Sequence, residues 1–113
     1  MKEIKAIIKP FILEKVLDAL DAMDDLPGVT ISEVMGWGRL PGRRSEKDVV
    51  HAGHAFAKRI KLEIVVKDEQ TEQVVTAVAA AARTGHPGDG KIFVLDVLDV
   101  VRIRTGERGS DVL

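Results

Sequence analysis

The residues of this chain best suited to binding an anion lie together in one glycine-rich segment, Thr84–Lys91. Gly88 and Gly90 allow the backbone to approach a ligand closely and to turn its N–H groups toward it, and Lys91 adds a positive charge. Gly85, Gly90 and Lys91 also match the spacing G-x-x-x-x-G-K of a phosphate-binding P-loop. The segment therefore predicts a phosphate site, and a plain helix end followed by a glycine-rich turn is the alternative.

Two features exclude a P-loop NTPase. Ile92 occupies the position where a serine or threonine would hold Mg²⁺. The segment also follows a predicted helix and enters a predicted strand, whereas a P-loop leaves a strand and points a helix N-terminus at the phosphates. We therefore expect anion binding without the P-loop fold.

Arg102 and Arg104 supply further groups that suit phosphate. The β-branched run Ile92–Val101 predicts a long strand that continues through Arg104, and residues two apart on a strand point to the same face. Two guanidinium groups on one face offer forked donors for phosphate oxygens. The strand would bring Lys91 and the two arginines into one neighbourhood, and charges on the solvent side of an edge strand are the alternative.

His51 and His54 are the candidate metal ligands. They would share a face if this segment were helical, and imidazole suits zinc, copper or nickel. A stable site needs three or four ligands, and the nearest carboxylates, Glu46 and Asp48, lie at no diagnostic spacing. Solvated loop histidines are therefore the favoured interpretation.

The composition excludes several functional classes. The chain has no cysteine, so a disulfide scaffold, cysteine-ligated zinc and a thiol nucleophile are ruled out. A net charge of −1, with three phenylalanines, one tryptophan and no tyrosine, argues against a nucleic-acid-binding protein. No serine has a recognisable base and orienting group, so we expect a protein that is not an enzyme.

The length and the N-terminal segment limit how the chain can be organised. A length of 113 residues suits a single domain, 1–113. The apolar run that Pro10 closes is too short and too interrupted by charge for a signal peptide or a membrane span. We expect a cytoplasmic protein with no direct membrane insertion.

The hydrophobic pattern places the candidate residues on a strand–helix–strand unit that occurs twice. The predicted elements are a strand Ile4–Lys9, a helix that begins at Pro10, has its apolar stripe as far as Met23 and is stopped by Pro27-Gly28, a strand from Val29 toward Trp37, a strand Arg59–Ile64, a helix with Asp68 as N-cap and Gly85 as its stop, and the strand from Ile92. Two such units predict an α+β, ferredoxin-like (βαβ-βαβ) sandwich with both helices on one face of an antiparallel sheet. The uncovered face predicts a homo-oligomer.

A long connection, residues 38–58, separates the two units. It leans basic and shows no sustained helical or strand period. Connections in compact domains usually run about 4–6 residues, and much longer ones are generally functional or disordered. Both a functional loop and a solvated insertion fit this segment.

Four segments together resemble the PII signal-transduction family. Ala6–Phe11 is similar to the opening strand of that family, and Gly36–Arg39 resembles its G-[FW]-G-R before the T-loop. Thr84–Val94 fits its C-terminal signature throughout, and Val101–Glu107 resembles its closing segment. The resemblance covers essentially the whole chain.

The resemblance implies a homotrimer of ferredoxin-like subunits with ATP or ADP in each of three clefts between neighbours, and Mg²⁺ can accompany ATP. The positions that match the family's nucleotide contacts are Gly88, Asp89, Gly90 and Lys91 around the phosphates, Arg102 and Arg104 reaching them from the adjacent subunit, Thr30 and Val65 around the base, and Gly38 and Arg39 at the root of the T-loop. The T-loop, 38–58, would dock on a target protein, either a membrane transporter or a metabolic enzyme. Residues 105–113 would form a C-terminal tail.

Three positions depart from the family pattern and indicate a divergent member with an atypical T-loop. Leu40 replaces the glutamine that coordinates Mg²⁺ and, through it, 2-oxoglutarate, and Arg59 replaces a lysine that pairs with that acid. Ala52 replaces the tyrosine that is modified in many members. The resemblance therefore implies nucleotide sensing without tyrosine modification and argues against ordinary 2-oxoglutarate sensing. The alternative is a metal-responsive PII-like trimer that uses His51 and His54 and is linked to metal or other transport.

Overall fold

The computed structural model describes residues 1–37, 49–51 and 54–113, the side chains of 49–51 and 54 excepted. Within these ranges the strands are β1 (Lys2–Ile8), β2 (Thr30–Gly36), β3 (Val49–His51), β4 (His54–Val66) and β5 (Lys91–Asp96). The helices are α1 (Leu13–Asp21) and α2 (Thr71–Ala82), and short 3₁₀ turns cover Pro10–Ile12, Asp68–Gln70 and Ser110–Val112. No helix among these residues is long and apolar enough to cross a lipid bilayer.

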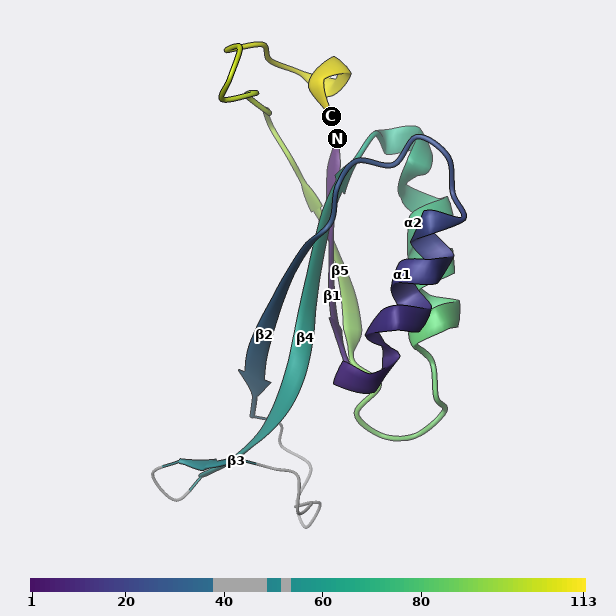
Figure 1. The fold of residues 1–113 in the computed structure, drawn as a ribbon, viewed down its shortest axis with the longest axis vertical. Coiled ribbons are helices and arrows are strands. Elements are labelled where there is room, and N and C mark those ends of the chain that lie inside the picture. The colour runs from purple at the N-terminus through teal and green to yellow at the C-terminus, as the bar shows by residue number, and fades with distance from the viewer. Residues whose placement is uncertain (38–48, 52–53) are drawn as a thin grey trace.

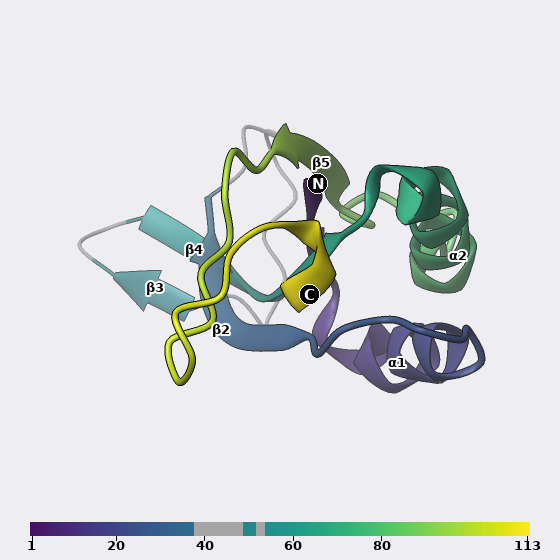
Figure 2. The same cartoon turned by 90° about the horizontal axis from the view of Figure 1, so that it is seen from above.

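The longer strands form one antiparallel sheet in the order β2-β4-β1-β5, and the short β3 pairs with the start of β4. Both helices cover the same face of this sheet (Figures 1 and 2). Along the chain, β1-α1-β2 and β4-α2-β5 repeat the strand–helix–strand order. The predicted ferredoxin-like α+β sandwich is confirmed.

The core lies between the sheet and the helices because alternate residues of the two central strands are apolar. The buried side chains of β1 and β4 are Ile4, Ala6, Ile8, Ile60, Leu62, Ile64 and Val66. They belong to one cluster with Val16 and Leu20 of α1 and Val74 and Val78 of α2. Full burial of a side chain of this size stabilises the fold by about 1.5–3 kcal/mol, so this layer holds both ends of the sheet in place.

No described helix covers the other face of the sheet (Figures 1 and 2). Phe93 and Leu95 of β5 are in register with β1 residues that alternate with its buried ones, and they remain 48% and 39% exposed. Beyond β5, Leu98 and Ile103 are almost fully exposed. Exposed large apolar side chains of this kind are typical of surfaces that contact another chain.

The predicted strand through Arg104 is wrong beyond Asp96. Asp96 is in register with Lys2, the first residue of β1, so β5 has no further length of β1 to pair with. The chain then turns, because the N–H of Gly106 donates to the carbonyl of Arg102 at 2.7 Å. Arg102 and Arg104 therefore do not share the face of a strand.

Three smaller predictions about element bounds and caps also differ from the structure. The connection 38–58 contains β3 and the first residues of β4, where we predicted no strand. Lys67, not Asp68, is the N-cap of the turn before α2, and the Asp68 carboxylate pairs with the N-terminal amine at 2.8 Å. Helix α1 ends at Asp21, short of Met23, where its predicted apolar stripe ends.

Candidate functional site

The glycine-rich segment connects α2 to β5 at the end of the sheet where β1 finishes (Figure 1). Helix α2 ends at Ala82, three residues before the predicted stop at Gly85. The chain then makes an open turn and enters β5 at Lys91. We call residues 84–91 the glycine loop.

The carboxylate of Asp89 holds the glycine loop together from inside. It accepts hydrogen bonds from the backbone N–H groups of Thr84 and Gly85, at 2.8 and 2.9 Å, and from the Thr84 hydroxyl. The ammonium of Lys9 lies 3.0 Å from this carboxylate and also donates to the Thr84 hydroxyl oxygen at 3.1 Å. The Asp89 side chain is therefore occupied within the protein, and its backbone is the part that a ligand can approach.

These contacts favour the ionised form of Asp89. The hydroxyl of Thr84, then its backbone N–H, the Lys9 ammonium and the N–H of Gly85, hold the pKa of Asp89 well below its ordinary value, against the opposing effect of partial burial. The loop thus carries a fixed, internally neutralised charge at neutral pH.

Two glycines of the loop are required by close approach as well as by conformation. Gly90 has φ +96°, and a Cβ there would lie 1.7 Å from the carbonyl oxygen of Ile7. Gly88 has φ +89°, and its Cβ would lie 3.0 Å from a guanidinium nitrogen of Arg59 and 3.6 Å from the Cε of Lys9. The loop therefore rests directly on the end of β1 and beside two basic side chains.

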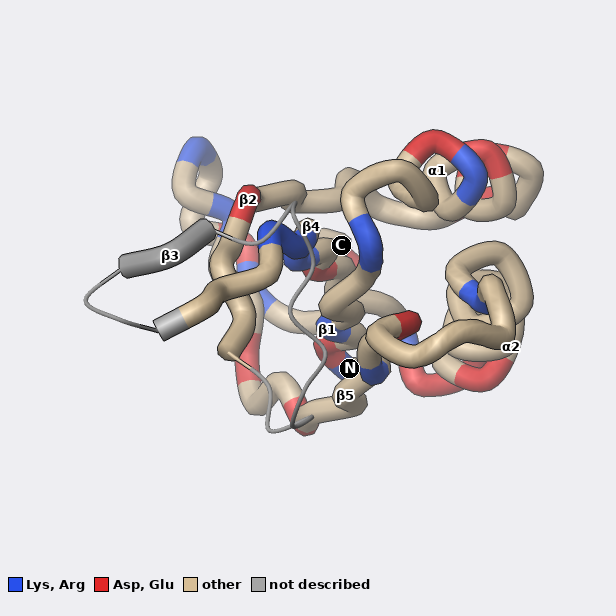
Figure 3. Tube along the Cα trace, turned by 90° about the horizontal axis from the view of Figure 1, so that it is seen from below, with Lys and Arg blue, Asp and Glu red and all other residues tan. Residues whose placement is uncertain are grey.

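Three basic residues, Lys9, Arg59 and Lys91, lie at or beside the glycine loop, at the end of the molecule that Figure 3 views directly. Lys9 pairs with Asp89, whereas the one hydrogen bond of Arg59 within the described part of the chain is to the carbonyl of Lys58, at 2.8 Å. Among the residues that the structure describes, Arg59 and Lys91 form no ion pair. A guanidinium and an ammonium group are thus available to an anion beside the glycine loop.

The segment that follows β5 and carries Arg102 and Arg104 lies toward the opposite end of the sheet from the glycine loop (Figure 1). Strand β5 itself carries the chain roughly 16 Å from Lys91 to Asp96, at about 3.3 Å per residue. Arg102 donates to the Glu107 carboxylate at 3.3 Å and to the Val112 carbonyl at 3.2 Å. Arg104 is exposed. One chain therefore does not bring Lys91 and the arginines together, contrary to the expectation from a single long strand.

The two residues assigned to the base lie away from the Lys91 end of the sheet. Val65 is in register with Glu3, near the start of β1, and Thr30 is level with Lys5 at the middle of that strand through its partner Glu63. Lys91, in contrast, is in register near the end of β1. The predicted site residues thus divide into two groups along the sheet.

Four predicted residues lie wholly or partly outside the described part of the chain. Gly38 and Arg39 are outside it, as are the side chains of His51 and His54. The backbone of β3 and β4 pairs His51 with His54 in an antiparallel register rather than on a helix. Among the described residues no group of three potential metal ligands is present.

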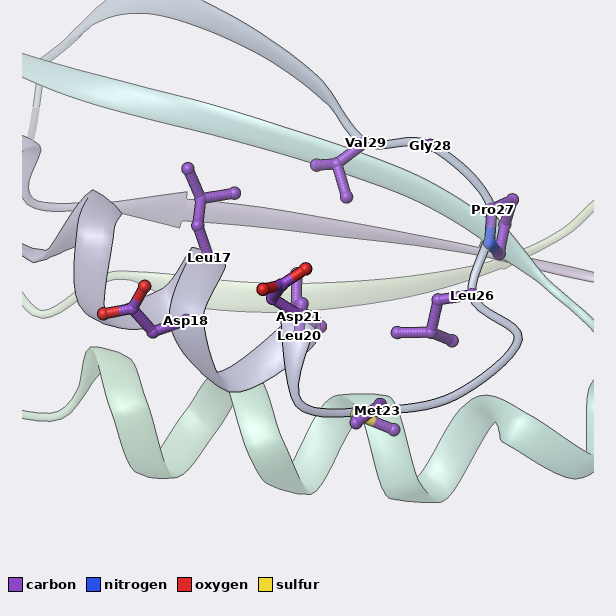
Figure 4. A pocket seen from close by; sticks show the side chains of 9 residues that line it. All are labelled: Leu17, Asp18, Leu20, Asp21, Met23, Leu26, Pro27, Gly28 and Val29. Carbon is purple, nitrogen blue, oxygen red and sulfur yellow. The ribbon is translucent and has the colours of Figure 1, made fainter.

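A groove of about 410 Å³ lies between the end of α1 and the connection to β2 (Figure 4). Its apolar lining comes from Leu17, Leu20, Met23, Leu26 and Val29, and Asp18 and Asp21 supply its charge. An acidic groove repels phosphate, and no predicted site residue lines it. It is therefore not a candidate for the anion site.

Sequence reasoning missed Lys9 and Thr84 as supports of the glycine loop. They are 75 residues apart, and no local motif links them. A signal was nevertheless available, because the ferredoxin-like topology places the last strand beside the first. A lysine directly after β1 is then expected to lie at the start of β5.

The sheet order, the two helices and the glycine loop between the second helix and the last strand define a small ferredoxin-like protein with a glycine loop at one sheet end. The family model described as "Nitrogen regulatory protein P-II" matches residues 1–107. The chain belongs to the P-II family, and the predicted resemblance is confirmed.

Similar proteins match over nearly the full length. The nitrogen regulatory protein P-II of Rhizobium meliloti (strain 1021) is 46% identical over 117 residues, with 100% of both chains covered. That of Pasteurella multocida (strain Pm70) is 45% identical over 113 residues, again with 100% of both covered. A crystal structure of Arabidopsis thaliana PII bound to citrate is 41% identical, with a TM-score of 0.79, and the match covers 97% of this chain and 89% of that one. The chain is thus a signal-transduction protein of a nitrogen regulatory family.

Proposed function

We propose that three copies of this chain form a cytoplasmic homotrimer that binds ATP or ADP in the clefts between neighbouring copies. The division of the predicted contacts between two ends of one sheet carries this proposal. Lys91 and the glycine loop stand at one end, the segment with Arg102 and Arg104 and the base residue Val65 lie toward the other, and Thr30 is level with the middle of β1. A site that uses both groups needs two copies of the chain, each supplying a different end.

The chemistry of the two groups suits an oligophosphate. Phosphate oxygens are bound by backbone N–H groups, by an ammonium as a point charge and by guanidinium groups as forked donors. The backbone at Gly88 and Gly90 would offer the N–H groups. Lys91 supplies the ammonium, and Arg102 and Arg104 supply the guanidinium groups. The Arabidopsis relative is bound to citrate, an organic polyanion, which supports anion binding on this scaffold.

The uncovered sheet face supports the assembly. Phe93, Leu95 and Leu98 leave apolar surface that a neighbouring copy would remove from water. Closed rings formed by contacts between two different surfaces are a standard way to build such oligomers. A trimer would then contain three equivalent clefts.

The bound nucleotide would control the segment 38–58, and that segment would dock on a target protein, a membrane transporter or a metabolic enzyme. ATP and ADP must have different affinities for two states of this segment, since a ligand shifts an equilibrium only through such a difference. Regulation by this route needs no catalysis, and the described residues offer no base positioned for hydrolysis. Mg²⁺ would accompany ATP as its counterion.

Subunit mixing tests the shared cleft directly. Lys91→Ala and Arg102→Ala/Arg104→Ala remove opposite halves of the site, and each variant alone should bind ATP on the order of 10- to 100-fold more weakly than the wild type. When the two are unfolded together and refolded, about a quarter of the clefts should combine an intact lysine with intact arginines. Calorimetry should then detect that fraction of sites at wild-type affinity.

Lys15→Ala, on the exposed surface of α1, is the matched control and should leave ATP binding unchanged. Mixed preparations that regain no tight sites, while each variant remains trimeric, would contradict the shared cleft. Wild-type affinity in Lys91→Ala alone would contradict the assignment of the phosphate site.

A further inference from the structure

The guanidinium group of Arg102 is already occupied by the C-terminal part of its own chain. Its Nη1 donates to the carboxylate of Glu107 at 3.3 Å, and its Nη2 donates to the carbonyl of Val112 at 3.2 Å. The backbone supports the arrangement, since the N–H of Arg102 donates to the carbonyl of Glu107 at 2.8 Å. Both terminal nitrogens of the fork therefore have partners before any ligand is present.

A phosphate that binds both terminal nitrogens of Arg102 would have to replace the Glu107 carboxylate and the Val112 carbonyl. A carboxylate and a carbonyl oxygen take the donors that two phosphate oxygens take in bidentate binding. Glu107 also carries a negative charge, which repels an approaching phosphate at this distance. A nucleotide can use the whole fork of Arg102 only after Glu107 and Val112 have left it.

We propose that the Glu107 carboxylate and the Val112 carbonyl act as an internal competitor for the nucleotide at Arg102, and that Glu107 sets the affinity of the cleft. The inference rests on the proposed function, since it assigns Arg102 to phosphate. Binding of ATP would release the segment 107–113 from Arg102, and removal of the competitor would tighten ATP binding.

The expected effect is modest because the contact is exposed. The side chains of Arg102 and Glu107 are 40% and 58% exposed. An ion pair in this setting changes an equilibrium constant by about 1.5- to fivefold. Arg104 forms no ion pair among the described residues, so the competition acts on one of the two arginines.

The decisive variant is Glu107→Gln, which keeps the size of the side chain and removes its charge. Its Kd for ATP, measured by calorimetry, should fall about 1.5- to fivefold below that of the wild type. Asp111→Asn is the matched control, because it removes the same charge from the same segment and Asp111 pairs with no described residue. It should leave the Kd close to the wild-type value.

A second measurement follows the segment itself in the full-length wild type. The N–H groups of Val112 and Leu113 donate to the carbonyls of Gly109 and Ser110, at 3.2 and 3.3 Å. In ¹⁵N NMR, saturating ATP should narrow and shift the resonances of these two amides, and should not do so in Lys91→Ala.

The outcomes distinguish a failure of the proposed function from a failure of the competitor alone. A wild type that binds no ATP overturns the proposed function and the competitor with it. ATP binding that is intact in the wild type but equal in Glu107→Gln, with unchanged Val112 and Leu113 resonances, overturns the competitor alone. Equal tightening in Glu107→Gln and Asp111→Asn would show a general charge effect and would also overturn the role of Glu107.

Discussion

The glycine loop and the C-terminal segment both hold basic side chains against acidic ones, but the two arrangements differ in how far they are shielded from water. At the glycine loop the side chains of Lys9 and Asp89 are 14% and 25% exposed. At the other end, those of Arg102 and Glu107 are 40% and 58% exposed. The first pair is a structural support of the fold, and the second is a surface contact that solvent screens.

This difference in shielding indicates which end can bind a ligand without first rearranging. The Asp89 network and the contact of Gly90 with β1 fix the glycine loop, so its backbone conformation is set without a ligand. Arg102 must exchange partners before it can bind phosphate. A cleft built from both ends would combine a preformed half with an adjustable half.

A substitution at Gly90, where the preformed half makes its tightest contact, should cause the largest loss of unfolding free energy. In Gly90→Ala the new methyl group meets a backbone oxygen that cannot move away, and the residue keeps a strained φ. We expect a loss of about 3 kcal/mol or more of unfolding free energy, measured by urea denaturation. Gly106→Ala, at φ +76° with open space around its Cβ, is the control and should cost about 1–2 kcal/mol. Equal losses in both variants would show that conformation alone, and not contact with β1, requires Gly90.

The pH dependence of stability distinguishes the two ends, because the pKa of Asp89 is lowered in the folded state. Because its pKa is lowered in the folded state, Asp89 contributes stability that is fully present above its unfolded pKa of about 3.9 and is lost as the pH falls toward the folded value. Asp89→Asn should lower the melting temperature at pH 7 by about 4–8 °C and flatten the decline of stability below pH 4. Glu107→Gln, at the exposed end, should lower it by less than about 2 °C. An acid limb that is the same in Asp89→Asn and the wild type would refute the role of Asp89.

The smallest expected effect concerns a second ligand at the loop end. Arg59 keeps a positive charge there, but Leu40 offers no oxygen to Mg²⁺. We expect saturating 2-oxoglutarate to leave the Kd of ATP unchanged in calorimetry with Mg²⁺ present. Leu40→Gln, which supplies the missing oxygen, should make ATP binding tighter in the presence of 2-oxoglutarate. A wild type that already shows this tightening would place it among ordinary 2-oxoglutarate sensors.

The fold was predictable from periodicity because the alternation of Ile60, Leu62 and Ile64 has one physical solution, a strand with one buried face. The end of the last strand was not predictable in the same way. Val101 and Ile103 continue the apolar alternation, yet a strand also needs a partner, and β1 offers none beyond Lys2. Periodicity records which residues favour burial and says nothing about where the neighbouring strand stops.

The candidate site was predictable in part for a related reason. Gly88, Gly90 and Lys91 form a contiguous motif, so their chemistry can be recognised locally. The support from Lys9 depends on a contact with Thr84 across 75 residues, and the competition at Arg102 depends on a turn. Contacts of this kind follow from the three-dimensional path of the chain and leave no local pattern.

The separation of Lys91 from the arginines has a genetic consequence. In the proposed trimer each copy gives its loop to one cleft and its arginines to another, so one altered copy in a ring of three damages a cleft that its neighbour needs. A copy that carries Lys91→Ala together with Arg102→Ala/Arg104→Ala would disable two of the three clefts. Such an allele, expressed beside the wild type, should therefore be dominant, whereas a loss of the whole protein should be recessive.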